Sequence, residues 1–404
     1  MRDSAGIPGG TVAAGGTSKP PRGRRRRLLR LLGIGIVLLV LVGVAAGWWL
    51  YAKLDANIHV DSSAEAELRR YERERPASVA VGAQNILLIG SDSRTGTANS
   101  RYGSDGGTER SDTAILLHLP ADRRSATAVS IPRDLMTDIP PCLGADGSRT
   151  RERFAQFNWA FQWGGVACTI RTVERLTGIR VDHHMVVDFG GFKKMVDAVG
   201  GVEVCLREPM NDAEAHLRLP AGRQTLRGEQ ALGFVRARHG LGDGSDTERM
   251  ERQQEFLGSL VKKVQSNGVL LNPTRLFPLL DAATSAVTTD PGLASLRGLY
   301  ELVRGVRDIP TEQVKFLTVP RRPYAADPNR DELVQPDAAR LFGQLRADRP
   351  LTVTPPSPTP SAAGRDASGS DGTSGPVRSG SGIAATPTPV PTFTGTTAGT
   401  ADCR

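Results

Sequence analysis

The chain has 404 residues, a formal net charge of +8 and 23% charged residues. This length allows two average domains, or one large domain with appendages. The first 27 residues are rich in glycine and arginine, and about the last 50 in Pro, Ser, Thr and Gly, so neither end is expected to build a core. A chain folded throughout is therefore excluded, and the folded part is expected at about residues 80–350, enough for one α/β domain with a large core.

The strongest physical signal is an apolar run near the N-terminus. Residues 31–50 read LLGIGIVLLVLVGVAAGWWL and carry no charge. At about 1.5 Å per residue this run crosses a hydrocarbon layer of about 30 Å, and Trp48, Trp49 and Tyr51 lie where aromatic rings prefer the interface. We predict a single transmembrane helix over residues 28–51. A cleaved signal peptide is the alternative, but the run is too long and WWLYAKL lacks a small-x-small cleavage site.

Arginines precede this run, at Arg22, Arg24–Arg27 and Arg30. The positive-inside tendency predicts a disordered cytoplasmic head over residues 1–27 and an extracellular location for everything after Tyr51. RGRRRR could also indicate a nucleic-acid partner. Topology and anionic lipid explain a polybasic segment beside a membrane span better, so we expect the plasma membrane as location and partner, and no nucleic acid.

Four cysteines suit an oxidising exterior: Cys142, Cys168, Cys205 and Cys403. The sequence does not choose among the three pairings. We expect Cys142 with Cys168 and Cys205 with Cys403, and free thiols are the alternative. None of the four has a metal-like CxxC spacing, so zinc is not expected.

The elements expected beyond the span indicate a central sheet covered by helices. Residues 52–80 are charged and helix-permissive and are predicted to form an extracellular stalk, while residues 351–404 are predicted to be a disordered tail. Apolar, β-branched runs typical of buried strands are found at 84–90, 113–119, 126–131, 181–187, 202–206 and 313–319. Helical patterns are found at 158–176 (broken at Gly164-Gly165), 189–199, 228–235, 247–266, within 273–306 and at 336–346.

Polar clusters stand at the ends of these elements, where functional sites usually lie. They are residues 90–94 (GSDSR), 110–113 (RSDT), 130–134 (SIPRD), 236–239 (RARH) and 246–253 (DTERMERQ). Together they supply a few carboxylates and many guanidinium groups, which is what a divalent cation and a pyrophosphate require. Each cluster alone could equally be loop charges, an exposed ion pair or, for Asp246, a helix N-cap.

Six segments resemble the LytR–CpsA–Psr family in sequence and order. They are NILLIGSDSR, RSDTAILLHL, VSIPRDL, GIRVDHHMVVDFGGFKKMVDAVGGVEV, LRGEQALGFVRARH and DTERMERQQEFL, and the match is dense over residues 82–265 and loose to about 349. The resemblance implies a catalytic domain over residues 81–350. Its fold would be a three-layer α/β/α sandwich with a central mixed β-sheet and a deep apolar tunnel for a polyprenyl chain, preceded by a single transmembrane helix.

The resemblance also implies an activity. A phosphotransferase would move a glycopolymer from a polyprenyl-pyrophosphate carrier to a peptidoglycan hydroxyl, with Mg²⁺ or in its place Mn²⁺. By motif, Asp92 and Asp112 match the metal-binding carboxylates and, with Arg110 and Arg133, are the expected catalytic residues. The positions that match the family's pyrophosphate-binding residues are Arg110, Arg133, Arg236, Arg238, Arg249 and Gln253. The general base is not assigned, and Asp134 is a candidate only through its place in the sequence.

One segment departs from the family's pattern. Many relatives have a basic residue just before the Asn of a K-x-N-A-like motif, whereas this chain reads Gln156-Phe157-Asn158-Trp159-Ala160. One phosphate contact of the family is therefore in doubt, while the Asp–Arg core is kept.

Two other functions fit the same residues. A non-catalytic sensor would bind lipid-linked glycan outside and signal through the arginine head, but this head has only about 30 residues and no DNA-reading element. A polyprenyl-pyrophosphate pyrophosphatase would use water in place of the sugar hydroxyl, and the residues do not distinguish these acceptors.

Overall fold

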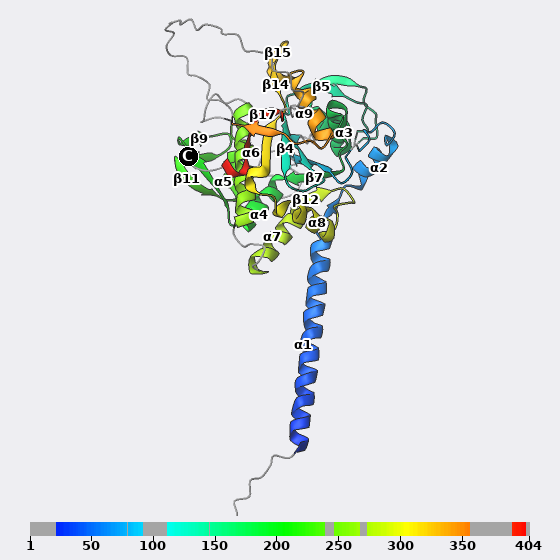
Figure 1. Cartoon of the computed structure of the whole chain (residues 1–404), viewed down its shortest axis with the longest axis vertical. Helices are drawn as coiled ribbons and strands as arrows, with labels where there is room; N and C mark the ends of the chain where they lie inside the picture. Colours follow the sequence, from blue (N-terminus) through cyan, green and yellow to red (C-terminus); the bar gives the residue numbers. More distant parts are fainter. Residues whose placement is uncertain are drawn as a thin grey trace, which may run out of the picture. The chain divides into compact units, whose positions relative to one another are not determined.

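The computed structural model describes residues 22–78, 80–91, 111–144, 146–238, 246–266, 273–355 and 390–400 (Figure 1). The chain divides into two compact units, residues 1–53 and residues 54–404. The first unit consists, in its described part, of most of helix α1 (Arg22–Ala56). Within the described residues, the stretch Arg27–Ala56 is the one helix long and apolar enough to cross a membrane. It exceeds the predicted 28–51 because residues 52–56 contain no helix breaker.

Residues 52–80 belong largely to the folded unit, so the prediction of a separate stalk is wrong. Strand β1 (His59–Val60) pairs in parallel with β12 (Val287–Thr289) at the edge of the main sheet. Helix α2 (Ser62–Arg70) follows, and its Ala64 and Leu68, four residues apart on one face, are buried in the core. Arg69 and Arg70 lie on the exposed side of α2, whereas Glu67 and, after the helix, Arg75 are buried. Composition alone indicated a stalk because it does not show which charges are buried.

The second unit is built around a mixed sheet of nine strands, in the order β1-β12-β7-β2-β3-β4-β13-β17-β16. Strand β2 pairs in parallel with β7 and antiparallel with β3, and β4 pairs antiparallel with β3 and in parallel with β13. The remaining bounds are β2 Gln84–Ser91, β3 Ser111–Leu119, β4 Ala126–Ile131, β7 His183–Asp188, β13 Val314–Thr318, β16 Thr352–Thr354 and β17 Thr392–Thr397. By this register the start of β3 lies beside the ends of β2 and β4, and this border is called the site edge below.

Helices cover both faces of this sheet, which confirms the predicted three-layer sandwich. Along β2 the side chains alternate, so that Leu87 and Ile89 join one core cluster while Ile86 joins another. The first cluster is closed by α2, α3 (Trp159–Thr177) and α9 (Asp337–Arg346). The second is closed by α6 (Asp246–Ser266) and α8 (Leu296–Arg307).

A third apolar cluster lies beside the sheet, where α6 packs on a smaller subdomain. Phe192, Phe234 and Phe256 form its aromatic centre, with ring centroids 5.6 and 6.3 Å apart. Its elements are α4 Phe189–Ala198, β8 Val202–Leu206, β9 Met210–Asp212, β10 Leu217–Leu219, β11 Gly222–Leu226, α5 Gly228–Arg236 and α7 Pro273–Ala286. Two further two-stranded ribbons stand near the site edge, β5 (Met136–Ile139) with β6 (Arg153–Gln156) and β14 (Arg321–Tyr324) with β15 (Asp327–Leu333).

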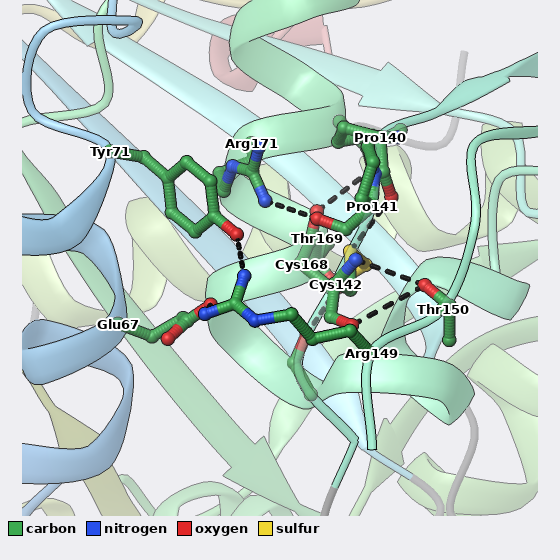
Figure 2. The surroundings of a disulfide bond; sticks show 12 residues. Glu67, Tyr71, Pro140, Pro141, Cys142, Arg149, Thr150, Cys168, Thr169 and Arg171 are labelled. Atoms are coloured by element: carbon green, nitrogen blue, oxygen red, sulfur yellow. Dashed lines mark hydrogen bonds and ion pairs between the residues drawn. A yellow bond between two sulfur atoms is a disulfide. The ribbon is translucent and has the colours of Figure 1, made fainter. Parts of the chain in front are cut away.

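The break predicted in α3 is confirmed, and a disulfide explains it. Gly164 and Gly165 have non-helical backbone angles inside α3, and Gly165 has a φ of +59°. The predicted bond between Cys142 and Cys168 is present, with Cα atoms 5.5 Å apart (Figure 2). A Cβ on Gly164 would approach the Cβ atoms of both cysteines to 2.8 Å, so the disulfide requires glycine at this position. Cys205 is also disulfide-bonded, whereas Cys403 lies outside the described residues.

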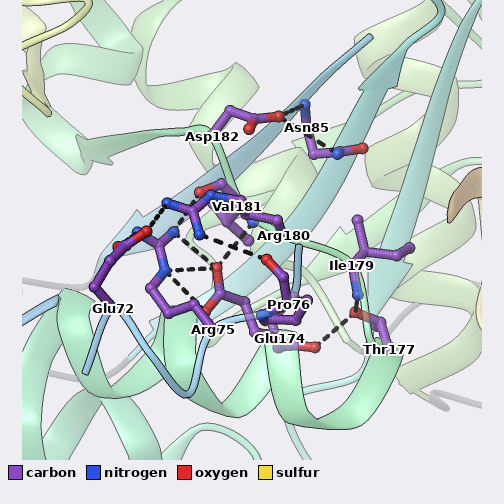
Figure 3. A network of polar contacts seen from close by, with 11 residues as sticks. Glu72, Arg75, Pro76, Asn85, Glu174, Thr177, Ile179, Arg180, Val181 and Asp182 are labelled. Carbon is purple, nitrogen blue, oxygen red and sulfur yellow. Dashed lines mark hydrogen bonds and ion pairs between the residues drawn. The ribbon is translucent and has the colours of Figure 1, made fainter. Parts of the chain in front are cut away.

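The segment after α2 is held to α3 by buried polar contacts (Figure 3). Arg75 donates from Nε and Nη2 to Glu174 at 3.0 and 2.8 Å, and from Nη2 to the carbonyl oxygen of Val181 at 2.7 Å. The side chains of Arg75 and Glu174 are only 9% and 3% exposed. Burial lowers the pKa of Arg75, but the carboxylates of Glu174, Glu72 and Glu65 together raise this pKa above its usual range.

Arg75→Ala is therefore expected to lower the free energy of unfolding by about 3–5 kcal/mol, because it leaves the Glu174 carboxylate buried without its cation. Chemical denaturation of the purified protein measures this. The matched control is Arg69→Ala, since Arg69 is 75% exposed and pairs with Glu65 on the surface of α2, where a cost below about 0.5 kcal/mol is expected. Equal costs for the two substitutions would contradict the role given to Arg75.

The predicted tail is partly wrong. Strand β17 pairs antiparallel with β13 and in parallel with β16, which places residues 392–397 inside the main sheet. Phe393 and Leu351 are buried in the core. A Cβ on Gly395 would lie 2.4 Å from the carbonyl oxygen of Phe316, so a glycine is needed for this close pairing. Residues 356–389 lie outside the described part of the chain.

Candidate functional site

The site edge brings together Asp112 and Arg133, two residues predicted from separate motifs. Asp112 is the second residue of β3, and Arg133 follows β4 after Pro132, which cannot donate a ladder hydrogen bond and ends the strand. Because β3 and β4 are antiparallel neighbours, the start of one lies beside the end of the other. Nη1 of Arg133 donates to Oδ1 of Asp112 at 2.8 Å.

Arg133 is shared by three carboxylates. Besides Asp112, its Nε lies 3.2 Å from Oδ2 of Asp134 and 3.9 Å from Oδ1 of Asp246. Burial alone would lower the pKa of Arg133, but Asp134 and Asp112 outweigh it and raise this pKa. The guanidinium group is therefore a permanent positive charge at the centre of an acidic cluster.

Helix α6 contributes the second half of the site through one face near its N-terminus. Asp246, Arg249 and Gln253 line the same pocket as Asp112 and Arg133, with about 200 Å³ of space, open solvent included. The spacings of three, four and seven residues place these side chains on one side of the helix. Asp246 forms an ion pair with Arg249 in the first turn of this helix, so it belongs to the site and is not merely a helix N-cap.

Arg249 is almost completely buried, at 4% exposure. Burial lowers the pKa of Arg249, Asp246 opposes this shift, and Arg133 and Arg238 add to it. Among the described residues, Nε of Arg249 and Oδ2 of Asp246 are buried and have no hydrogen-bond partner. Buried polar atoms are normally satisfied, so these two atoms have capacity to bind a ligand.

The other predicted anion-binding residues lie next to this pocket, on α5 and just after it. The guanidinium carbon of Arg236 lies 4.6 Å from the centre of the Phe189 ring. The backbone N–H of Arg238 donates to Oδ2 of Asp212 at 2.7 Å, and its charge acts on Arg249. The amide of Gln253 donates to the carbonyl oxygen of Val235 at 3.0 Å and so ties α6 to α5.

Several site residues were not found from the sequence. Gln156, at the position of the missing basic residue, donates to Oδ1 of Asp134 at 2.6 Å. Arg330 approaches the same oxygen at 3.4 Å from β15, 196 residues away in the chain. Arg321 on β14 contacts Asp331 and Thr247 of α6. Burial raises the pKa of Asp331, with Arg321 opposing this shift. No local signal in RRPYAADPNRDEL points to these contacts.

Asp92 and Arg110, the remaining predicted site residues, lie outside the described residues. Each is adjacent in sequence to a residue at the site edge, since Asp92 follows Ser91 of β2 and Arg110 precedes Ser111 of β3, and Ser91 pairs with Ser111.

The side chains at the site edge that could bind a divalent cation are carboxylates. The described residues contain no group of three or more His, Cys, Asp or Glu side chains that could hold a metal ion. Mg²⁺ commonly takes only one or two carboxylates and completes its octahedron with phosphate oxygens and water. Asp112 and the unpartnered oxygen of Asp246 are ligands of this hard type, so the residues fit a cation bound together with a phosphorylated substrate. The deep apolar tunnel is not evident in either described pocket and stays a prediction.

Comparison with known proteins decides the family. The sequence model described as "LytR_cpsA_psr family" matches residues 54–345, which is most of the chain. The chain belongs to the LytR_cpsA_psr family. The match begins at residue 54 and thus includes α2, in agreement with the burial of this helix.

Proteins with related sequence include two from bacteria. "Probable cell wall biosynthesis protein LcpB" of Corynebacterium glutamicum is 37% identical over 67% of this chain. The chain spans 60% of the length of that relative. TagV of Bacillus subtilis, a "polyisoprenyl-teichoic acid–peptidoglycan teichoic acid transferase", is 27% identical over 78% of this chain and 77% of its own length.

The fold of the LytR_cpsA_psr family is seen in solved structures as well. The LytR-Csp2A-Psr enzyme from Actinomyces oris aligns with 67% of this chain and 93% of its own chain, with a TM-score of 0.51 and 23% identity. At this identity the likeness establishes the mixed sheet with helices on both faces, and no more.

Proposed function

We propose that this protein is a phosphotransferase that moves a glycopolymer from a polyprenyl-pyrophosphate carrier to a peptidoglycan hydroxyl, forming a phosphodiester. The observation that carries the proposal is the pairing of Arg133 with three carboxylates beside the buried Arg249, whose Nε has no partner among the described residues. Arginine binds phosphate oxygens bidentately, and the carboxylates suit a divalent cation. The name of TagV, a family member that transfers teichoic acid to peptidoglycan, supports the same reaction class.

The geometry suits phosphoryl transfer because this reaction depends on positioning and on charge stabilisation. Arg133 and Arg249 would bind the pyrophosphate in the pocket, with Arg110, Arg236, Arg238 and Gln253 completing its surroundings. The acceptor hydroxyl forms a bond to the phosphorus nearer the sugar. The bond from this phosphorus to the bridging oxygen breaks, and polyprenyl monophosphate leaves.

The hydroxyl proton must pass to a base. Asp134 is the candidate, since its carboxylate is held by Gln156 at 2.6 Å, by Arg133 at 3.2 Å and by Arg330 at 3.4 Å, next to the pocket-lining Arg133. A carboxylate offers about four lone-pair positions, so these contacts leave room for an acceptor hydroxyl. These contacts also fix the orientation of the Asp134 carboxylate.

Mg²⁺, or Mn²⁺ in its place, would be held by Asp112 and Asp92. When bound, the cation supplies positive charge against the pyrophosphate oxygens. Asp112 pairs with Arg133 at 2.8 Å, so a side chain suited to the cation and one suited to the pyrophosphate lie directly beside each other.

The proposed location is the plasma membrane, with a cytoplasmic N-terminus and an extracellular catalytic domain. The arginines that precede the apolar helix support this orientation. The disulfide between Cys142 and Cys168 supports an oxidising compartment for the domain.

An assay of the full chain in nanodiscs tests the reaction. The substrates are a polyprenyl-pyrophosphate-linked oligosaccharide, Mg²⁺ and peptidoglycan oligomers. We expect peptidoglycan-linked phosphodiester and polyprenyl monophosphate in equal amounts. Oligosaccharide phosphate formed equally with and without acceptor would identify a pyrophosphatase instead. Binding of the lipid-linked sugar with no product would identify a sensor.

A further inference from the structure

Two aromatic rings meet at the surface beside the site. Phe154 on β6 and Tyr324 on β14 have ring centroids 6.0 Å apart, with the ring planes tilted by 57°. Phe154 is 54% exposed, although the three residues that follow it are buried. A single exposed apolar side chain is common on protein surfaces, so the informative feature here is that two aromatic rings from different strands meet beside the site.

The strand geometry connects Phe154 to the site. Side chains two residues apart on a strand lie on the same face, about 7 Å apart, so Phe154 shares a face with Gln156, which donates to Asp134. Ala155, between them, points the other way into the core cluster around the disulfide. The face of β6 that carries Phe154 is therefore the face that borders Asp134.

The hairpin β14–β15 connects Tyr324 to the same carboxylate. Tyr324 stands opposite Asp327 at the end of the hairpin. Asp327 pairs with Nε of Arg330 at 3.4 Å, and Nη1 of Arg330 reaches Asp134 at 3.4 Å. Asp134 is thus contacted by Gln156 of β6, the strand that carries Phe154, and by Arg330 of the hairpin that carries Tyr324. It also contacts Arg133.

Each ring has a carboxylate directly opposite it in its β-ladder. Asp138 on β5 stands opposite Phe154 and is exposed, and Asp327 stands opposite Tyr324. Directly opposed residues share a face of the ribbon. The two aromatic rings and the two carboxylates together are complementary to a sugar ring. The C–H groups of a sugar pack on the electron-rich face of an aromatic ring, and the hydroxyls of the sugar donate to carboxylates.

We infer that Phe154 and Tyr324 form a sugar-binding platform for the acceptor, the glycan strand of peptidoglycan. The inference rests on the proposed function, because it assigns the platform to the acceptor of that reaction. Asp138 and Asp327 place carboxylate oxygens beside the rings as acceptors for sugar hydroxyls, and Asp327 also pairs with Arg330. Asp134, the candidate base, lies between the platform and the arginines, where an acceptor hydroxyl must pass.

Binding of a soluble glycan, with no donor and in the presence of EDTA, tests the platform. The probe is the β-1,4-linked tetrasaccharide of N-acetylglucosamine and N-acetylmuramic acid, titrated by calorimetry into the full chain in nanodiscs. Phe154→Ala and Tyr324→Ala are each expected to raise Kd about three- to tenfold, and Phe154→Tyr should bind like the wild type. The matched control is Tyr300→Ala, since Tyr300 is 59% exposed on α8, away from the site edge, and should leave Kd unchanged.

Three outcomes would overturn the inference: no binding by the wild type, unchanged Kd in both alanine variants, or an equal loss in Tyr300→Ala. A fourth would move the platform to the donor, namely weaker binding of a soluble oligosaccharide phosphate but not of the tetrasaccharide. Thermal unfolding of each variant separates lost binding from lost fold. The readout involves no turnover, so a failed transfer assay would leave this result intact, and a failed binding result would leave transfer intact.

Discussion

Replacing Arg133 with methionine is expected to lower kcat/KM for glycan transfer about 10³-fold or more. Methionine keeps the apolar stem but removes the charge that Asp112, Asp134 and Asp246 share. The pyrophosphate would lose a bidentate donor, and Asp112 would lose its ion-pair partner, while Asp134 and Asp246 would keep Arg330 and Arg249. The measurement is the initial rate of peptidoglycan-linked product formation with the full chain in nanodiscs.

Two further variants make this result specific. Arg133→Lys keeps one positive charge but not the planar fork, and is expected to fall between the wild type and Arg133→Met. Arg69→Met removes an arginine that pairs with one exposed carboxylate, and should transfer normally. Activity of Arg133→Met within tenfold of the wild type would remove Arg133 from the site. Unfolding temperatures of all three variants show whether any loss comes from the fold.

A soluble fragment that begins at residue 82 is expected to be unfolded or aggregated, whereas one that begins at residue 54 should fold. The shorter fragment lacks β1 and α2, and with them the buried side chains of Ala64 and Leu68. Loss of one buried leucine costs about 2–5 kcal/mol. Loss of Arg75 leaves Glu174 buried without its cation, at about 3–5 kcal/mol.

These losses together match the whole stability of a typical domain, about 5–15 kcal/mol. Circular dichroism and analytical gel filtration of the two fragments, both ending at residue 404, measure the outcome. A further contact adds to the expectation, because Tyr71 stacks on Arg171 with the guanidinium carbon 3.4 Å from the ring centre (Figure 2). A folded, monomeric fragment starting at residue 82 would show that residues 54–81 contribute little.

The parts of the fold that the sequence predicted are those with strong local patterns. The apolar runs that became β2, β3 and β4 agree with the predicted strands to within two residues. Residues 59–60 and 392–397 were missed because a strand of two residues, or one rich in threonine after a low-complexity stretch, carries no local apolar signal. Their place is decided by pairing with β12 and β13, far away in the chain.

In the site too, residues next to local sequence patterns were predicted, and residues placed by long-range contacts were not. Motifs next to predicted strands gave Asp112 and Arg133, and the cluster at residues 246–253 gave Arg249 and Gln253. Asp246 belonged to the same cluster but was left open as a possible helix N-cap, because its ion pair with Arg249 and its approach to Arg133 need the tertiary fold. Arg330 could not be found, since the hairpin that carries it meets Asp134 across 196 residues of sequence. Asp92 and Arg110 stay predictions.

The return of β17 to the main sheet fixes the C-terminal region to the folded domain. Strand β17 pairs with β13 on one side and with β16 on the other, where Thr352 stands opposite Thr392. Its Phe393 is buried in the core. A chain that ended before β17 would therefore leave the backbone groups at the edge of β13 unpaired and open a space in the core where the Phe393 ring now packs.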